Sequence, residues 1–191
     1  MGMPATTPRW TREVVLELIA RNPLQTPRYE LVDGELLVTP APSGLHQFAV
    51  RVLLELLAHY FTDHPGLGDV LVSPADVMLE EGTTVGPDVF VVPSVEARRI
   101  RREYPVRVLL LAVEVLSPGD RSGDRTRKRE LYQRTIPEYW IVDTSDRVIE
   151  VWHPGAVRPV VQRDRLEWRA AGAATPFVLD VRAYFGRVYG E

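Results

Sequence analysis

Residues 107–116 read RVLLLAVEVL, a stretch that is nearly all aliphatic. An aliphatic run of this kind is typical of a strand that is buried on both faces of a sheet, with helices covering both sides. Glu114 is the one acidic residue in the run. Because a buried carboxylate is unfavourable without a cation or hydrogen-bond donors beside it, the stretch predicts a polar partner for Glu114. That partner is either an arginine in a plain salt bridge or part of a functional site.

Patterns on both sides of this strand indicate a mixture of helices and strands. Thr11 is placed to cap a helix that runs to about Ala20. The dipeptide Asp33-Gly34, which readily takes the positive φ angles of a tight turn, indicates a hairpin over 29–38. Apolar residues at helical spacing predict a long core helix over 45–61. We further expect strands at 69–72, 76–79, 85–92, 139–143 and 148–152, a polar helix at 124–135 and a short closing element at 177–184.

The composition indicates one folded domain. The chain has 191 residues, of which 45% are hydrophobic, and this suits a single core. No apolar run reaches the roughly 18 residues needed to span a bilayer, and the first residues, MGMPATTPRW, lack the apolar core of a signal peptide. We therefore expect a cytoplasmic protein with no membrane partner. Cysteine is absent, so any metal must be held by oxygen or His ligands.

Positive charge is concentrated in one segment of an acidic chain. The formal net charge is -3, but residues 98–134 contain 11 Arg or Lys against 5 Asp or Glu. This segment is either a phosphate-contacting surface or an ordinary solvated face. Eight of its arginines form two clusters, Arg98, Arg99, Arg101 and Arg102 in the first and Arg121, Arg125, Arg127 and Arg129 in the second.

Two carboxylates are candidates for a metal site. Asp88 follows Gly86-Pro87 and precedes an apolar run, where it is either a simple turn residue or a functional group. Glu114 lies within the buried strand described above. If the two strands are neighbours, their carboxylates form an oxygen-rich site that suits a hard divalent cation such as Mg²⁺ or Mn²⁺.

Lys128 is the only lysine in the chain, and every other permanently basic side chain is an arginine. Lysine carries a compact charge whose pKa shifts readily, whereas arginine keeps its proton and spreads its charge over a planar fork. Asp124, Lys128 and Tyr132 are four residues apart, so one helix face carries all three. Lys128 is either the cation of a reactive site or a lysine that is present by chance on a solvated helix.

Several motifs together resemble the Uma2 family, over a range of about residues 10 to 152. That family belongs to the PD-(D/E)XK nuclease superfamily, whose members cut phosphodiesters with a divalent metal. The motifs are YELVDGE at 29–35, Pro42-Ser43 through His46-Gln47, PDVFVV at 87–92, EVLSP at 114–118 and PEYWIVD at 137–143.

The resemblance implies a restriction-endonuclease-like mixed β-sheet flanked by helices. It also implies a metal-dependent endonuclease that acts on DNA and assembles as a homodimer. The single domain, 1–191, would then consist of an N-terminal helix and hairpin at 10–40, a catalytic core at 41–152 and a C-terminal extension at 153–191. The implied site has Asp88, Glu114 and the Val115 carbonyl on Mg²⁺ or Mn²⁺, Lys128 beside the reacting phosphate, and Glu30, Asp124 and Tyr132 in support.

One position departs from the superfamily pattern. Its lysine usually lies two residues after the acidic strand residue, where this chain has Leu116. The Uma2 pattern resembles a version in which the lysine has migrated to the following helix, here as Lys128. His46 also matches the family pattern, without a chemical role that the sequence suggests.

Two other functions stay open at this point. One is a catalytically silent binding or assembly module that keeps the nuclease fold, which the overall negative charge favours. The other is a phosphodiesterase for a small substrate. For the homodimer, the aromatic residues of the C-terminal third either supply the contact surface or close the core of the monomer. They are Trp152, Trp168, Phe177, Tyr184, Phe185 and Tyr189.

Overall fold

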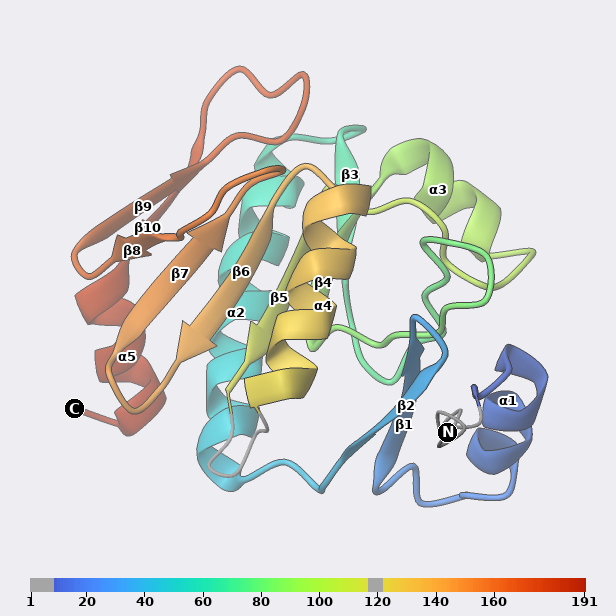
Figure 1. Ribbon diagram of the computed structural model, residues 1–191. Helices are drawn as coiled ribbons and strands as arrows, with labels where there is room; N and C mark the ends of the chain where they lie inside the picture. The colour runs from blue at the N-terminus through green and yellow to red at the C-terminus, as the bar shows by residue number, and fades with distance from the viewer. Residues whose placement is uncertain (1–8, 117–121) are drawn as a thin grey trace.

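The computed structural model describes residues 9–116 and 122–191, and Figure 1 shows a central twisted sheet with helices on both of its faces. The sheet has six strands in the order β3-β4-β5-β6-β7-β8, and two separate hairpins, β1-β2 and β9-β10, lie beside it. Only β5 and β6 are parallel, so the sheet is mixed, as the sequence predicts.

The elements of the first half of the chain are α1 (Arg12–Ala20), β1 (Arg28–Val32), β2 (Glu35–Thr39), α2 (Gly44–Asp63), β3 (Gly68–Val72), β4 (Val89–Pro93) and α3 (Ser94–Ile100). Those of the second half are β5 (Leu111–Val115), α4 (Ser122–Thr135), β6 (Tyr139–Asp143), β7 (Val148–Trp152), β8 (Val160–Gln162), β9 (Arg165–Trp168), β10 (Phe177–Asp180) and α5 (Val181–Tyr189).

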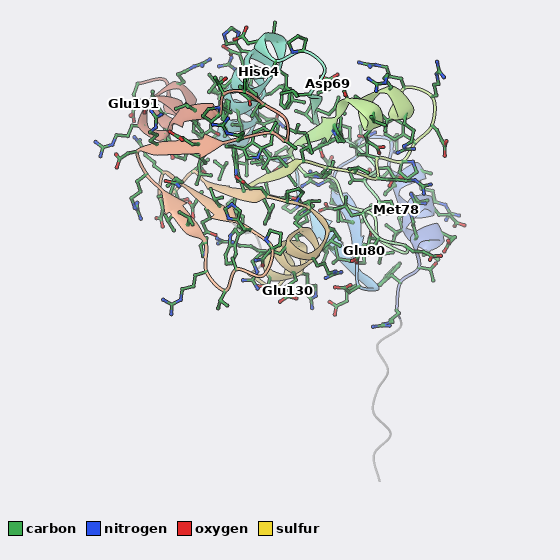
Figure 2. All side chains as sticks on the ribbon, turned by 90° about the horizontal axis from the view of Figure 1, so that it is seen from above. His64, Asp69, Met78, Glu80, Glu130 and Glu191 are labelled. Carbon is green, nitrogen blue, oxygen red and sulfur yellow. The ribbon has the colours of Figure 1, made fainter. Side chains whose placement is uncertain are left out.

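The sheet separates two hydrophobic cores. One contains Val113 and Val115 of β5 and packs against α2, α5 and the β9-β10 hairpin. The other contains Ala112 of β5 and packs against α4, α3 and the β1-β2 hairpin. Seen from above in Figure 2, His64 at the end of α2 and Glu130 of α4 lie on opposite sides of the sheet. Because side chains alternate along a strand, Glu114 shares the α4 side with Ala112.

Several element boundaries predicted from the sequence are wrong. The strand expected over 76–79 is reduced to isolated bridges from Val77 to Val85 and Val106. The strand expected over 85–92 begins only at Val89, because Pro87 has no N–H to donate to a ladder. The strand expected over 107–116 is shorter, Leu111–Val115, and the segment 177–184 is divided between β10 and α5.

The C-terminal aromatic residues close the chain's own core. Trp152, Trp168, Phe177, Tyr184 and Phe185 are all buried, and only Tyr189 is exposed among the six. They therefore give no support to a contact surface, and the homodimer stays a prediction. In the described ranges, none of the helices is both long and apolar enough to cross a membrane.

Candidate active site

Asp88 and Glu114 meet where β4 and β5 lie side by side. The antiparallel register pairs Val89 with Val113, which places Asp88 directly before β4 and opposite Glu114. The backbone N–H of Val115 donates to Asp88 Oδ2 over 2.9 Å. Both carboxylates are buried, with 5% and 8% of each residue exposed, and both line the same pocket. The structure thus brings together the two acids that the sequence singled out.

Lys128 reaches these carboxylates from the helix. Its Nζ lies 3.0 Å from Glu114 Oε1 and 2.7 Å from Glu30 Oε2, and the residue is only 7% exposed. One helical turn further on, the Tyr132 hydroxyl donates to the same Glu114 oxygen over 3.2 Å. The lysine therefore occupies the neighbourhood of Glu114 although it is rooted on α4 and not on β5.

Of the two other predicted supporting residues, Glu30 lies in the site, and the side chain of Asp124 is outside the described residues. Glu30, on β1, is 1% exposed, and its Oε1 accepts the backbone N–H of Gly86 over 2.9 Å. It therefore joins the site from the hairpin, outside the segment 41–152 that the sequence suggested as the catalytic core. Asp124 belongs to the first turn of α4, and its side chain lies outside the described residues, as does Arg121.

Arg28 is a central residue that the sequence reasoning missed. Its Nη1 lies 3.1 Å from Asp88 Oδ1, its Nη2 lies 3.7 Å from Glu114 Oε2, and its Nε lies 3.6 Å from Glu30 Oε2. Arg28 and Glu30 are two residues apart on β1, so their side chains share a face of the strand. That spacing is the signal that could have found Arg28 once Glu30 was a candidate.

His46 also contacts the site, from the opposite layer of the fold. It lies in the first turn of α2, where its backbone N–H donates to the capping hydroxyl of Ser43 over 3.2 Å. Its Nε2 lies 3.0 Å from Asp88 Oδ2. Because an ionised carboxylate only accepts, Nε2 carries the proton, and Nδ1 is buried with no hydrogen-bond partner in the part of the chain that the structure describes. His46 therefore holds Asp88 in place, a role that the sequence pattern did not suggest.

Comparison with known proteins assigns the chain to a family. The model of the Uma2 family, described as "Putative restriction endonuclease", matches residues 16–181. The chain belongs to the Uma2 family. Among solved structures, the fold resembles a crystal structure from Anabaena variabilis described as a putative nuclease belonging to DUF820. The TM-score is 0.69 at 15% identity, over 85% of this chain and 92% of that chain, which shows a shared fold. A search of curated proteins found no match.

The carboxylates of this Uma2 site have opposite pKa shifts. Burial, reinforced by the nearby charges of Asp88 and Glu30, raises the pKa of Glu114 to about 7 although Lys128 opposes the shift. Burial also acts on Asp88, but the hydrogen bond from His46 and the charge of Arg28 outweigh it and lower the pKa of that carboxyl. The site therefore holds one firmly ionised acid and one that titrates near neutral pH.

The cations of the site keep their protons. Burial works against the charge of Lys128, but Glu114 and Glu30 outweigh it and raise the pKa of the ammonium group. Burial of Arg28 is likewise outweighed, by Glu30, Asp88 and Glu114, so its pKa is also raised. With all groups ionised, three carboxylates surround two permanent cations, and the cluster carries one uncompensated negative charge.

A pocket of about 490 Å³ gives access to this cluster. Arg28, His46, Asp88, Glu114 and Lys128 all lie on its lining. Arg125 lines it as well and forms an ion pair with Glu150. The arginines of the first basic cluster lie on α3 and directly after it, and none of them lines this pocket.

The residues present fit a hard divalent cation. In the described part of the chain, no group of three His, Asp or Glu side chains is placed to hold a metal ion. Mg²⁺ requires less, because it is commonly bound by one or two carboxylates together with waters and substrate phosphates. Asp88 Oδ1 and Glu114 Oε2 both face one positive group, the Arg28 guanidinium. These two oxygens are therefore already oriented toward a shared cation, and Val115, whose carbonyl is the predicted third ligand, lines the same pocket.

Proposed function

We propose that this protein is a metal-dependent endonuclease that hydrolyses phosphodiester bonds in DNA. The observation that carries the proposal is the 3.0 Å contact between Lys128 Nζ and Glu114 Oε1, next to Asp88 and open to the pocket. Superfamily nucleases combine two acids and one lysine in this way, and here α4 provides the lysine that Leu116, two residues after Glu114, does not. DNA as substrate is inferred from the restriction endonuclease description of the family.

In this proposal Asp88, Glu114 and the Val115 carbonyl hold Mg²⁺ or Mn²⁺. The bound metal supplies Lewis acidity toward a phosphate oxygen and lowers the pKa of a water molecule. Lys128 places a compact positive charge where negative charge accumulates on the phosphoryl oxygens, and its hydrogen bond to Glu114 keeps it oriented. Tyr132 orients Glu114 by a hydrogen bond, and Glu30 orients Lys128 by an ion pair. His46 fixes the rotamer of Asp88.

A cleavage assay tests the proposal. The purified protein is incubated with supercoiled plasmid, single-stranded circular DNA and RNA, with Mg²⁺, with Mn²⁺ and with EDTA. We expect metal-dependent cleavage of DNA, and loss of at least about a hundredfold in Asp88→Asn and Glu114→Gln, since each removes a proposed metal ligand.

The matched control is Glu130→Gln, which removes an exposed carboxylate from the outer side of α4. It should cleave as the parent does. A parent that cleaves no nucleic acid with either metal, while folded by circular dichroism, contradicts the proposal and favours the silent binding module. Cleavage of a small phosphodiester such as bis(p-nitrophenyl) phosphate without cleavage of DNA favours the small-substrate alternative.

A further inference from the structure

The Arg28 guanidinium sits between the carboxylates that the proposed function assigns to a metal. It lies 3.1 Å from Asp88 Oδ1 and 3.7 Å from Glu114 Oε2, at a place where both oxygens can share one positive charge. The other oxygen of each carboxylate has protein partners already. Asp88 Oδ2 accepts from His46 and from the Val115 N–H, and Glu114 Oε1 accepts from Lys128 and Tyr132. The two oxygens that face Arg28 are therefore the ones left for a cation.

We propose that Arg28 is a built-in competitor of the divalent cation. Its guanidinium neutralises Asp88 and Glu114 in the metal-free protein and leaves them when Mg²⁺ binds. The inference rests on the proposed function, because it takes Asp88 and Glu114 as metal ligands. It adds a residue, contributed by β1, that sets the metal concentration at which the site fills.

Charge balance favours replacement of Arg28 by the divalent ion over binding of the ion beside Arg28. The three carboxylates of Glu30, Asp88 and Glu114 exceed the two cations Arg28 and Lys128 by one charge. A divalent ion added beside Arg28 would leave the buried cluster with a net positive charge and would set two cations against each other at short range. A divalent ion that replaces Arg28 leaves the cluster neutral. Arginine cannot leave by losing its proton, so the side chain itself must move.

Arg28 is also the more exposed of the two cations of the cluster. Its side chain is 24% exposed and lines the pocket, whereas the Lys128 side chain is 8% exposed. Among the described residues, its contact with Asp88 is its one hydrogen bond, and its Nε is buried without a hydrogen-bond partner. Leaving the cluster breaks one hydrogen bond and three ion pairs, which the divalent ion replaces at Asp88 and Glu114, and it exposes Nε to water, which satisfies it.

The test is a calorimetric titration of metal-free protein with Mg²⁺ and separately with Mn²⁺. Arg28→Gln should bind each ion at least about tenfold more tightly than the parent, because the competing cation is gone. The matched control is Arg125→Gln, which removes the same charge from the same pocket but leaves the contacts of Asp88 and Glu114 intact. Its affinity should stay within about threefold of the parent.

A second measurement needs no stable Arg28→Gln protein. Side-chain ¹⁵Nε–H spectra of the parent follow the Arg28 resonance, assigned by its absence in Arg28→Lys, during the addition of Mg²⁺. We expect that resonance to move and its solvent exchange to quicken as the site fills. An unmoved Arg28 resonance at saturating Mg²⁺, or equal affinities of parent and Arg28→Gln, overturns the competitor role and leaves the metal-dependent function standing.

The remaining outcomes are equally decisive. If only Arg28→Gln binds metal, Arg28 competes strongly enough to keep the parent empty, and the inference is supported. If neither protein binds Mg²⁺ or Mn²⁺, the competitor role and the metal-dependent function are both wrong.

Discussion

Strand β5 directs Val113 and Val115 to one face of the sheet and Glu114 to the other, and the two faces, although each has a hydrophobic core, differ at the end of the strand. The Val113 side is an apolar core packed against α2 and α5, with stacked and edge-on aromatic rings around Trp140. On the Glu114 side, at the end of the strand, three carboxylates and two cations lie together, and all of them are buried except the half-buried Arg28.

The apolar face stabilises the fold, whereas the charged cluster holds the residues of the candidate active site. Apolar burial on the first face stabilises the fold in rough proportion to area and needs no partner of opposite charge. Buried ion pairs contribute little net stability, but removal of one member leaves an uncompensated charge that is strongly destabilising. The charged cluster is therefore tolerated because the apolar face is large, and its members depend on one another.

The largest expected effect comes from the apolar face. Leu57→Ala removes a fully buried side chain of α2 and should lower the free energy of unfolding by about 2 to 5 kcal/mol. Urea unfolding followed by circular dichroism measures it, with Leu24→Ala, at an 81% exposed position, as the control. Cleavage per folded molecule should not change. A loss below about 0.5 kcal/mol would contradict the division between the two faces.

The second effect belongs to the charged face and concerns activity. Lys128→Ala should reduce metal-dependent DNA cleavage by roughly a hundredfold or more, because it removes the charge proposed to face the reacting phosphate. Lys128→Arg should recover little, since a planar fork cannot replace a compact ammonium group between Glu114 and Glu30.

Both variants must first be shown to be folded, because Lys128 has buried ion-pair partners. Arg51→Ala, which removes an exposed charge from α2, serves as the control. Cleavage by folded Lys128→Ala at the parent's rate would exclude the lysine from the mechanism.

The third effect is a pH dependence of stability. Since the pKa of Glu114 rises from 4.5 to about 7 on folding, the folded protein binds more protons than the unfolded chain between these values. Its contribution to stability is present below pH 4.5 and is lost as pH rises through 7. Between pH 5 and pH 8 the metal-free parent should lose about 2 kcal/mol from this group alone.

Glu114→Gln has no carboxyl to titrate at this position and should lack that part of the slope. Unfolding by urea in EDTA at several pH values gives the comparison. Asp88 does not interfere, because its lowered pKa places its own transition below this window. Identical slopes in the parent and in Glu114→Gln would show that Glu114 is ionised in the folded protein throughout.

The smallest effect is expected from one hydroxyl. Tyr132→Phe removes the 3.2 Å hydrogen bond to Glu114 Oε1 and should lower the free energy of unfolding by about 1 kcal/mol. Tyr104→Phe, at a 58% exposed position, should change it by close to zero. If both substitutions are equally harmless, the Tyr132 hydroxyl does not stabilise the charged cluster.

The sequence predicted the architecture well because its signals are local. Hydrophobic periodicity located α2, the alternating and continuous apolar runs located β3, β5, β6 and β7, and the Asp33-Gly34 turn located the β1-β2 hairpin. The errors fall where local patterns are weak. The segment 76–79 is strand-like in composition but forms only isolated bridges. Helix α3 was not predicted, because its arginine-rich sequence indicated a charged surface and gave no clear helical pattern.

The candidate site was only partly readable. Asp88, Glu114 and Lys128 each carry a local anomaly, as a carboxylate beside or within an apolar strand or as a sole lysine. Arg28 carries none, because it is one of many arginines and two of its three partners, Asp88 and Glu114, lie far from it in the sequence. His46 is likewise defined by a contact with a residue 42 positions away, which composition and periodicity do not encode. Charge pairing of this kind is decided by tertiary structure.

The order in which the site residues leave the ribosome has its own consequence. Arg28 and Asp88 are 60 positions apart, and Glu114 and Lys128 are 14 apart, so the site has no precursor in a short nascent chain. A chain grown as far as Glu114 has all three carboxylates and no lysine. The parallel strand β6, which must close beside β5, is synthesised later still. The charged cluster can therefore assemble only after α4 and β6 have been synthesised.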